Sequence, residues 1–191
     1  MRLINKELAD KTQWEKAGIQ LPKFDREAML TATKKTPKWL HLGPGNIFRA
    51  FLGALAQNLL ENGLEETGII TVEAYDNEII DKCYSPFDNL CLSVTLKSDG
   101  NIEKKIIAYV ASSYRIDKET DAVKEIFTSP SLQIVSFTIT EKGYALRGQD
   151  GALLPDIAED LNTGPGSAKS CLGRIAALCH ERYTHGAFPL A

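Results

Sequence analysis

The most constraining feature of this chain is a strand, a glycine-containing turn, a helix and a second strand that follow one another directly. Residues 38–42 (KWLHL) are largely apolar and end at Gly43, which predicts a short buried strand. After the turn, apolar side chains recur at helical spacing until a glycine ends the run, at Phe48, Phe51, Leu52, Leu55, Leu59 and Gly63. Residues 69–75 (IITVEAY) predict the second strand. This succession predicts a βαβ unit, whose strands are parallel.

The same alternation of strands and helices continues through most of the chain. Apolar runs predict further strands at residues 90–96, 105–110 and 132–140, and helical spacing predicts helices at residues 77–84, 117–127 and 167–183. The segment Ser98-Asp99-Gly100 predicts a turn that joins the first two of these strands into a hairpin. Alternating strands and helices favour an α/β fold with a doubly wound, mostly parallel sheet of the Rossmann type.

The two ends of the chain differ from this pattern. Residues 1–36 are polar and mixed, and we expect them to form an N-terminal arm with one or two short helices. Residues 37–191 carry the alternating pattern and are predicted to form the Rossmann-type domain. Residues 188–191 (FPLA) are typical of a strand that is just beginning, so we expect this domain to be incomplete at its C-terminal end, before its last strands.

Charge and cysteine content exclude several classes of function. The 191 residues carry a net charge of -3, which provides no basic field for nucleic acid or an anionic membrane. The first residues lack the apolar core of a secretory signal, and no apolar run is long enough to cross a membrane. The four cysteines form no CxxC pair, so we expect reduced thiols in a cytoplasmic protein. His180 and His185 share no helix face, so no metal site is expected, and His41 is expected to be a hydrogen-bonded core residue.

The turn itself, in the segment HLGPGNIFRAF, has the spacing of a phosphate-binding turn. The first glycine of such a turn permits a sharp change of direction, and the second lets the backbone approach a pyrophosphate. Gly43 and Gly45 fit these roles, and two polar residues of the next helical turn are placed to cap the helix and to reach an anion, Asn46 and Arg49. Phe48 stands where a third glycine is often found, and we expect its ring to hold the helix away from the strand. A tight turn before an ordinarily capped helix remains the alternative.

An acidic side chain at the end of the second strand is the other mark of a nucleotide site, because it accepts from ribose hydroxyls. Asp76 follows the predicted strand directly and is expected to make this contact. Glu73 is the rival, but it lies inside the predicted strand, where burying a charge is costly. Asp76 is equally well placed to cap the helix predicted from Asn77, so both roles stay open.

Two segments, HLGPGNIFRAF and QIVSFTITEKGY, resemble one enzyme family, the polyol-specific long-chain dehydrogenases, which includes mannitol 2-dehydrogenase, fructuronate reductase and tagaturonate reductase. The turn of that family, G-x-G-N-F-x-R-A, is matched at Gly43, Gly45, Asn46, Arg49 and Ala50. Its second motif, T-x-T-E-x-G-Y, is matched at Thr138, Thr140, Glu141, Gly143 and Tyr144. The chain departs from the family at Ile47-Phe48, where the aromatic residue is shifted by one position.

The resemblance implies the cofactor-binding domain of an NAD(P)-dependent oxidoreductase that interconverts a polyol or hexonate with its ketose or keto-uronate. NAD is the expected cofactor, with NADP as the alternative, and a small sugar or polyol is the expected substrate of the full-length protein. The residues expected to bind the cofactor are Gly43, Gly45, Asn46, Ile47, Phe48, Arg49, Asp76, Thr140 and Glu141.

In this family, catalysis depends on a lysine, an asparagine and a histidine that lie beyond the two matching segments, mainly in a helical second domain. No catalytic residue is therefore expected in this chain, which by itself should be inactive. The alternative to an enzyme is a non-catalytic, regulatory nucleotide-binding module with the same fold.

Overall fold

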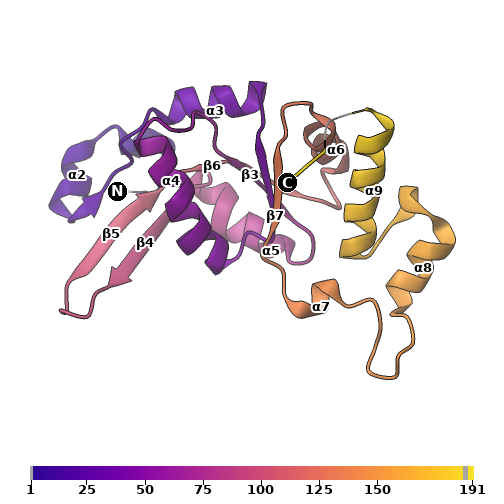
Figure 1. The fold of residues 1–191 in the computed structure, drawn as a ribbon. Coiled ribbons are helices and arrows are strands. Elements are labelled where there is room, and N and C mark those ends of the chain that lie inside the picture. Colours follow the sequence, from indigo (N-terminus) through magenta and orange to yellow (C-terminus); the bar gives the residue numbers. More distant parts are fainter. Residues whose placement is uncertain (1, 187–188) are drawn as a thin grey trace.

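The computed structural model describes residues 2–186 and 189–191, which form two β-sheets with surrounding helices (Figure 1). The larger sheet has four parallel strands, in the order β6 (Val110–Arg115), β3 (Ile69–Glu73), β2 (Trp39–Leu42) and β7 (Ile134–Phe137). Of these four strands, β2 comes first along the chain. It lies inside the sheet, and the later strands lie on both sides of it. This is the strand order of a doubly wound Rossmann sheet, and it confirms the predicted α/β fold.

Helices and shorter helical turns connect the strands. In chain order they are α1 (Asn5–Leu8), α2 (Lys11–Lys16), α3 (Arg26–Lys35), η1 (Phe48–Leu52), α4 (Gly53–Glu61), α5 (Asn77–Ile79), η2 (Ile80–Tyr84), η3 (Ser85–Phe87), α6 (Thr120–Thr128), α7 (Glu141–Tyr144), α8 (Pro155–Thr163), η4 (Pro165–Ser167) and α9 (Cys171–Thr184). The segments η1 and η2 are π-helical turns that continue into or out of α-helices. The helices predicted at residues 77–84, 117–127 and 167–183 are confirmed as α5 with η2, as α6 and as α9.

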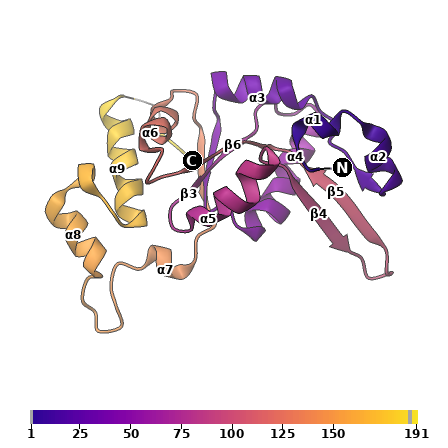
Figure 2. The ribbon, with the colours of Figure 1, turned by 180° about the vertical axis from the view of Figure 1, so that it is seen from behind.

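Helices cover both faces of the parallel sheet, as the two opposite views show (Figures 1 and 2). On one face, Leu60 of α4 belongs to the same buried cluster as Ile69 of β3. On the other face, Leu178 of α9 belongs to a cluster with Val72 of β3. Because side chains alternate along a strand, Ile69 and Val72 point to opposite faces, so the sheet is buried on both sides.

The smaller sheet consists of β1 (Ile19–Gln20), β5 (Ile102–Ile107) and β4 (Cys91–Leu96), in that order. Strands β4 and β5 form the predicted antiparallel hairpin. The prediction of one strand over residues 105–110 is wrong, because β5 ends at Ile107 and a new strand, β6, begins at Val110. Sequence pattern missed β6 because its segment VASSYR is mostly small and polar, and most of its residues are only partly buried.

The N-terminal residues pack on this smaller sheet. Trp14 of α2 is almost completely buried and lies in one cluster with Ile106 of β5. Arg26 begins α3, is itself buried, and donates hydrogen bonds to the backbone carbonyl of Ala108 and to two further carbonyls. Residues 2–36 therefore share a core with the hairpin, and the domain boundary placed at residue 36 stays a prediction.

The outer edge of β7 carries one more piece of the chain. The N–H of Ala191 donates to the carbonyl of Gln133 at 2.9 Å, and the N–H of Val135 donates to the carbonyl of Ala191 at 3.0 Å. Ala191 thus occupies a sheet position next to β7, although residues 189–191 are not assigned to a strand. Phe188, also part of the strand predicted here, lies outside the described residues.

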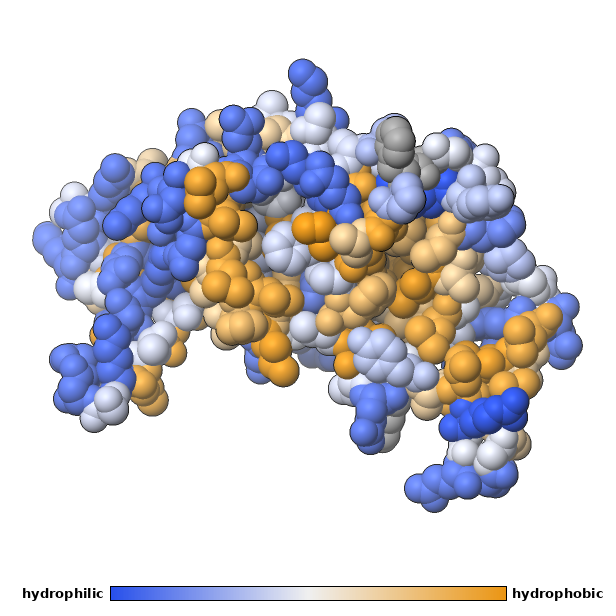
Figure 3. All heavy atoms as spheres, viewed as in Figure 1, coloured by the Kyte–Doolittle hydropathy of each residue, from blue (hydrophilic) through white to orange (hydrophobic). Residues whose placement is uncertain are grey.

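The helix after the glycine turn is found as predicted, but most of its apolar stripe faces outward. Phe51, Leu55 and Leu59 are 62, 51 and 41% exposed, whereas Ala56 and Leu60 form the buried side. Figure 3 shows the apolar side chains gathered over α4 on this face of the molecule. The periodicity therefore located the helix correctly but did not show which of its sides meets the core.

Two further observations concern the whole described chain. Within residues 2–186 and 189–191, none of the helices has the length and apolar character needed to cross a bilayer. The cysteines are free thiols, at Cys83, Cys91, Cys171 and Cys179.

Candidate cofactor site

A hollow of about 380 Å³ opens at the carboxyl ends of β2, β3 and β7. It is lined by Gly43, Gly45, Glu73, Tyr75, Thr138, Ile139, Thr140 and Gly143. Later strands join β2 on both sides, β3 on one and β7 on the other, so the hollow lies at the topological switch point of the sheet. In open α/β sheets, this is the place where ligands bind.

Gly43 is required by the fold. Its φ of +90° is rarely adopted by residues with side chains, and a Cβ built on it would lie 2.6 Å from the carbonyl oxygen of Thr138. Its own N–H donates to the carbonyl of Val72 at 3.1 Å, which attaches the turn to the end of β3. The first glycine of the motif therefore permits a left-handed backbone conformation and a close approach to the chain after β7.

Gly45 is not required by the fold in either of these ways. Its φ lies outside the left-handed region, and a Cβ built on it would meet no atom within 4 Å. Gly45 nevertheless lines the hollow. A side chain here would project into open space at the place where the second glycine of a phosphate-binding turn meets its ligand.

The helix after the turn begins at the edge of the hollow. The N–H of Arg49 donates to the carbonyl of Gly45 at 3.1 Å and closes the first helical turn. The first N–H groups of a helix have no acceptor within it, so those of Asn46, Ile47 and Phe48 are placed to bind an anion. The side-chain oxygen of Asn46 accepts from the Arg49 guanidinium, which lies 5.6 Å from the ring centre of Tyr84.

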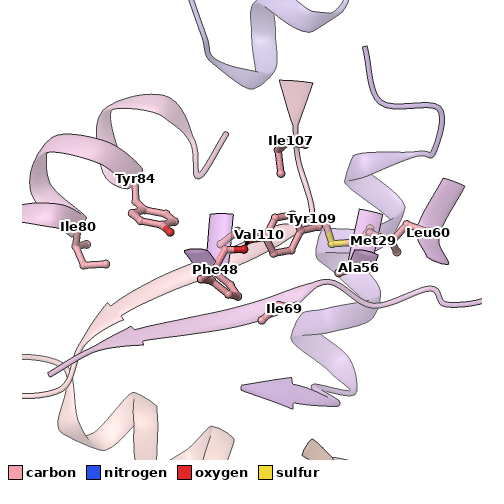
Figure 4. Packing of buried hydrophobic residues seen from close by; sticks show 10 residues of the cluster. All are labelled: Met29, Phe48, Ala56, Leu60, Ile69, Ile80, Tyr84, Ile107, Tyr109 and Val110. Carbon is pink, nitrogen blue, oxygen red and sulfur yellow. Dashed lines mark hydrogen bonds between the residues drawn. The ribbon is translucent and has the colours of Figure 1, made fainter. Parts of the chain in front are cut away.

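The side chain of Phe48 lies in the core and does not line the hollow. Its ring is fully buried, stacks on His41 with 3.9 Å between ring centres, and meets Tyr109 edge-on at 5.4 Å. Figure 4 shows Phe48 and Tyr109 side by side in the apolar cluster. The side chain of Phe48 is therefore not available to bind the cofactor, and the expectation is wrong for it. Its backbone N–H, in the first turn of the helix, is the part of Phe48 that stays a candidate for binding. The Phe48 ring lies against β2 through its stacking on His41, and the expected separation of helix and strand stays a prediction.

Hydrogen-bonded side chains lie beneath the turn. The two ring nitrogens of His41 meet the hydroxyls of Ser136 at 2.8 Å and Thr138 at 2.9 Å. His41 is fully buried, which confirms its prediction as a core residue. Burial lowers the pKa of His41 to about 4, against the smaller opposing effect of a hydrogen bond to the Gly43 carbonyl. The imidazole is therefore neutral at neutral pH.

The prediction that Glu73 lies in the middle of the second strand is wrong. Glu73 is the last residue of β3, and it lines the hollow. One of its carboxylate oxygens accepts from the backbone N–H groups of Ala74 at 2.8 Å, Tyr75 at 2.8 Å and Asp76 at 3.3 Å. These three donors compensate for the burial of the charge and fix the turn that follows β3.

Asp76 makes the helix cap that was one of its two predicted roles. Its carboxylate accepts from the N–H of Glu78 at 3.1 Å at the start of α5, and its side chain is exposed. It does not line the hollow, although it follows Glu73 and Tyr75 at the same end of β3. The contact of Asp76 with a ribose stays a prediction.

The second motif has one residue in the hollow and one beside it. Thr140 lines the hollow, and its carbonyl accepts from the N–H of Gly143 at 2.8 Å. Glu141 begins α7, is exposed, and is not among the lining residues. Four further residues line the hollow that the sequence did not predict as site residues: Tyr75, Thr138, Ile139 and Gly143. Thr138 and Gly143 carried a signal, because both match the second motif.

A parallel sheet of this order, with a glycine turn at its switch point, is the architecture of Rossmann-type nucleotide-binding domains, and the chain belongs to that class. No family model matches it. It is 47% identical, over its whole length, to the D-mannonate oxidoreductase of Thermotoga maritima, covering 36% of that protein. It is 27% identical to the mannitol 2-dehydrogenase of Cereibacter sphaeroides, over 90% of this chain and 35% of that protein.

Solved structures agree with these relatives. The mannitol 2-dehydrogenase of Pseudomonas fluorescens, in a ternary complex with NAD and D-mannitol, matches with a TM-score of 0.81 and 25% identity, over 100% of this chain and 38% of that one. A substrate-free D-sorbitol dehydrogenase shares the fold with a TM-score of 0.76. The chain is thus homologous to the polyol and hexonate dehydrogenases and corresponds to their N-terminal domain. It spans about a third of the length of these relatives.

Proposed function

We propose that this chain is the NAD-binding domain of an oxidoreductase that interconverts a polyol or hexonate with its ketose or keto-uronate. The observation that carries the cofactor role is Gly45, which lines the hollow although nothing in the fold requires a glycine there. The polyol or hexonate substrate is inferred from the relatives, which include a D-mannonate oxidoreductase at 47% identity.

The residues of the site fit a dinucleotide with its pyrophosphate at the start of the helix. The backbone of Gly45 leaves room for the phosphates, and the N–H groups of Asn46, Ile47 and Phe48 supply donors together with the positive end of the helix dipole. Arg49 adds a positive charge in the same helical turn.

The two ends of the cofactor extend in opposite directions from the pyrophosphate. Glu73 fixes the turn after β3, and Asp76 in that turn accepts from the adenosine ribose hydroxyls, which favours NAD over NADP. Thr140 and Glu141, in the segment that follows β7, lie on the nicotinamide side. When bound, NAD supplies the hydride acceptor or donor, and this chain's residues bind and orient it.

Proton transfer is assigned to the remainder of a longer parent protein. Two observations support this assignment: the relatives are nearly three times as long as the aligned region, and η1 and α4 present exposed apolar side chains at Phe51, Leu55 and Leu59. A further domain that covers this stripe would bury it. The free thiols support a reducing compartment, and we place the parent protein in the cytoplasm.

The test is a comparison of the full-length parent protein with this chain alone. The parent should reduce NAD in the presence of a hexonate or polyol, with D-mannonate and D-mannitol as the first substrates, and this chain should show no turnover above a mock-purified control. NAD binding by the parent without turnover on any hexonate or polyol would favour a regulatory module instead.

A further inference from the structure

A chain of hydrogen bonds runs under the glycine turn from one end of β2 to the other. It starts at the indole N–H of Trp39, which donates to the hydroxyl of Ser136 at 2.7 Å. The same hydroxyl meets Nδ1 of His41 at 2.8 Å, and Nε2 of His41 meets the hydroxyl of Thr138 at 2.9 Å. The Thr138 hydroxyl donates to the carbonyl of Gly43 at 2.6 Å. This series of hydrogen bonds thus joins four side chains, from β2 and from β7 and the residue next to it, and ends at the backbone carbonyl of Gly43, the first residue of the turn.

Only one arrangement of protons satisfies every member of this chain. The indole can only donate, so the hydroxyl of Ser136 accepts from Trp39. Among the described residues, Nδ1 of His41 is the acceptor within reach of the proton that this hydroxyl carries, so the proton goes to Nδ1. A backbone carbonyl can only accept, so the single proton of the Thr138 hydroxyl goes to Gly43. That hydroxyl must then accept from Nε2–H of His41. The ring is therefore neutral and carries its proton on Nε2.

Hydrogen bonds from interior side chains fix the direction of the two backbone carbonyls of the turn, those of Gly43 and Pro44. The Gly43 carbonyl accepts from the Thr138 hydroxyl and from the N–H of Gly45 at 2.7 Å, with Nε2 of His41 at 3.3 Å. The next carbonyl, of Pro44, accepts from the buried hydroxyl of Tyr84 at 2.8 Å. Both carbonyls before Gly45 are thus held by interior side chains. Carbonyls turned inward place no negative dipole toward an anion at the helix start.

We propose that His41, oriented by Trp39 and Ser136, is a positioning residue that sets cofactor affinity without touching the cofactor. The proposal rests on the proposed function, since the anion concerned is the NAD pyrophosphate. His41 is fully buried and lies under the hollow without lining it. Its role is to keep Thr138 as a donor to Gly43, so that the turn keeps one shape before the ligand arrives. Ser136 is likewise outside the lining of the hollow, so a change there reaches the turn through His41, and the hydrogen bond that it also loses, from Trp39, lies at the opposite end of β2.

The experiment uses the full-length parent protein and three measurements. Nitrogen NMR of histidine-labelled wild-type protein, assigned with a His41→Gln variant, should show His41 as the neutral Nε2–H form at neutral pH.

Calorimetry of NAD binding to Ser136→Ala should show a dissociation constant raised about fivefold, which corresponds to the loss of one hydrogen bond. Ser136→Thr, which keeps the hydroxyl, should restore affinity. Thr95→Ala, at an exposed position of β4, is the matched control and should bind NAD like wild type. Apo melting temperatures separate lost affinity from lost folding.

Specific results overturn the proposal. His41 found as the Nδ1–H form, or protonated at neutral pH, contradicts the proton arrangement whatever the NAD affinities of the other variants. Wild-type NAD affinity in Ser136→Ala contradicts the positioning role. If Ser136→Ala does not fold, Thr138→Val, which keeps the side-chain shape, should weaken NAD at least as much, and Thr138→Ser should restore it; equal affinities of these two variants would contradict the role. Failure of the wild-type parent to bind NAD contradicts the proposed function instead, so the two failures are distinguishable.

Discussion

The inner layer and the outer surface of the site differ in what holds their residues in place. The inner layer comprises His41, Gly43, Phe48 and Glu73, and the outer surface comprises Gly45, Asn46, Ile47 and Asp76. Inner residues are buried or have contacts that the fold demands. The outer residues are exposed or border open space, and only Asp76 among them also caps a helix. Neighbours in the sequence thus serve different purposes, and substitutions should separate stability from binding.

The largest effect is expected from the inner glycine. Gly43→Ala places a methyl group 2.6 Å from a backbone oxygen at a φ of +90°. The combination of steric overlap and backbone strain should lower the free energy of unfolding by about 3 kcal/mol or more. Urea denaturation of the apo parent protein measures this change. A variant as stable as wild type would show that the fold does not require a glycine at position 43 and would contradict its assignment to the inner layer.

The next effect concerns pH and the buried histidine. His41 has a folded-state pKa of about 4 against 6.5 for the free side chain, so between these values the unfolded chain binds more protons. Stability should therefore fall as the pH drops from 6.5 toward 4, by on the order of 2 kcal/mol at pH 5. The unfolding free energy of His41→Gln should lack this component, whereas His180→Gln, at an exposed position, should keep it. Parallel pH profiles for both variants would contradict the assignment.

The two carboxylates at the end of β3 and in the turn after it, Glu73 and Asp76, should repeat the contrast between inner layer and outer surface on a smaller scale. Glu73→Gln replaces a charged acceptor of three backbone N–H groups and should cost about 1–2 kcal/mol of stability. The preference for NAD over NADP should remain. Thermal unfolding and the ratio of NAD to NADP efficiencies measure the two effects. A changed preference between NAD and NADP with unchanged stability would show that Glu73 belongs with the outer residues that serve binding.

Asp76→Asn is the matched substitution and should have the smallest effect on the fold, because asparagine still caps α5. Removing the charge relieves repulsion of the 2′-phosphate of NADP, so the preference for NAD should narrow by about fivefold to tenfold. Steady-state kinetics with both cofactors provides the ratio. If it does not change, Asp76 is a helix cap alone.

The sequence supports the fold more completely than it supports the site. Glycine and apolar periodicity predicted the βαβ unit, because backbone conformation and strand burial leave a local signal. The outward stripe of α4 and the buried face of Phe48 were not predictable, since periodicity does not show which side of a helix meets the core. Glu73 was misjudged because its three N–H donors come from a turn whose start depends on where β3 ends.

Gly45→Ala in the full-length parent protein tests the central claim most directly. Its methyl group meets no protein atom, so the apo melting temperature should stay close to that of wild type. The same methyl group would stand where the pyrophosphate approaches, at a cost on the order of 1–3 kcal/mol, or roughly tenfold or more in affinity. Calorimetry of NAD binding beside thermal melting without ligand measures both. Weakened binding with an unchanged apo melting temperature is the predicted result. Unchanged NAD affinity, with or without a loss of apo stability, would contradict the proposed cofactor site.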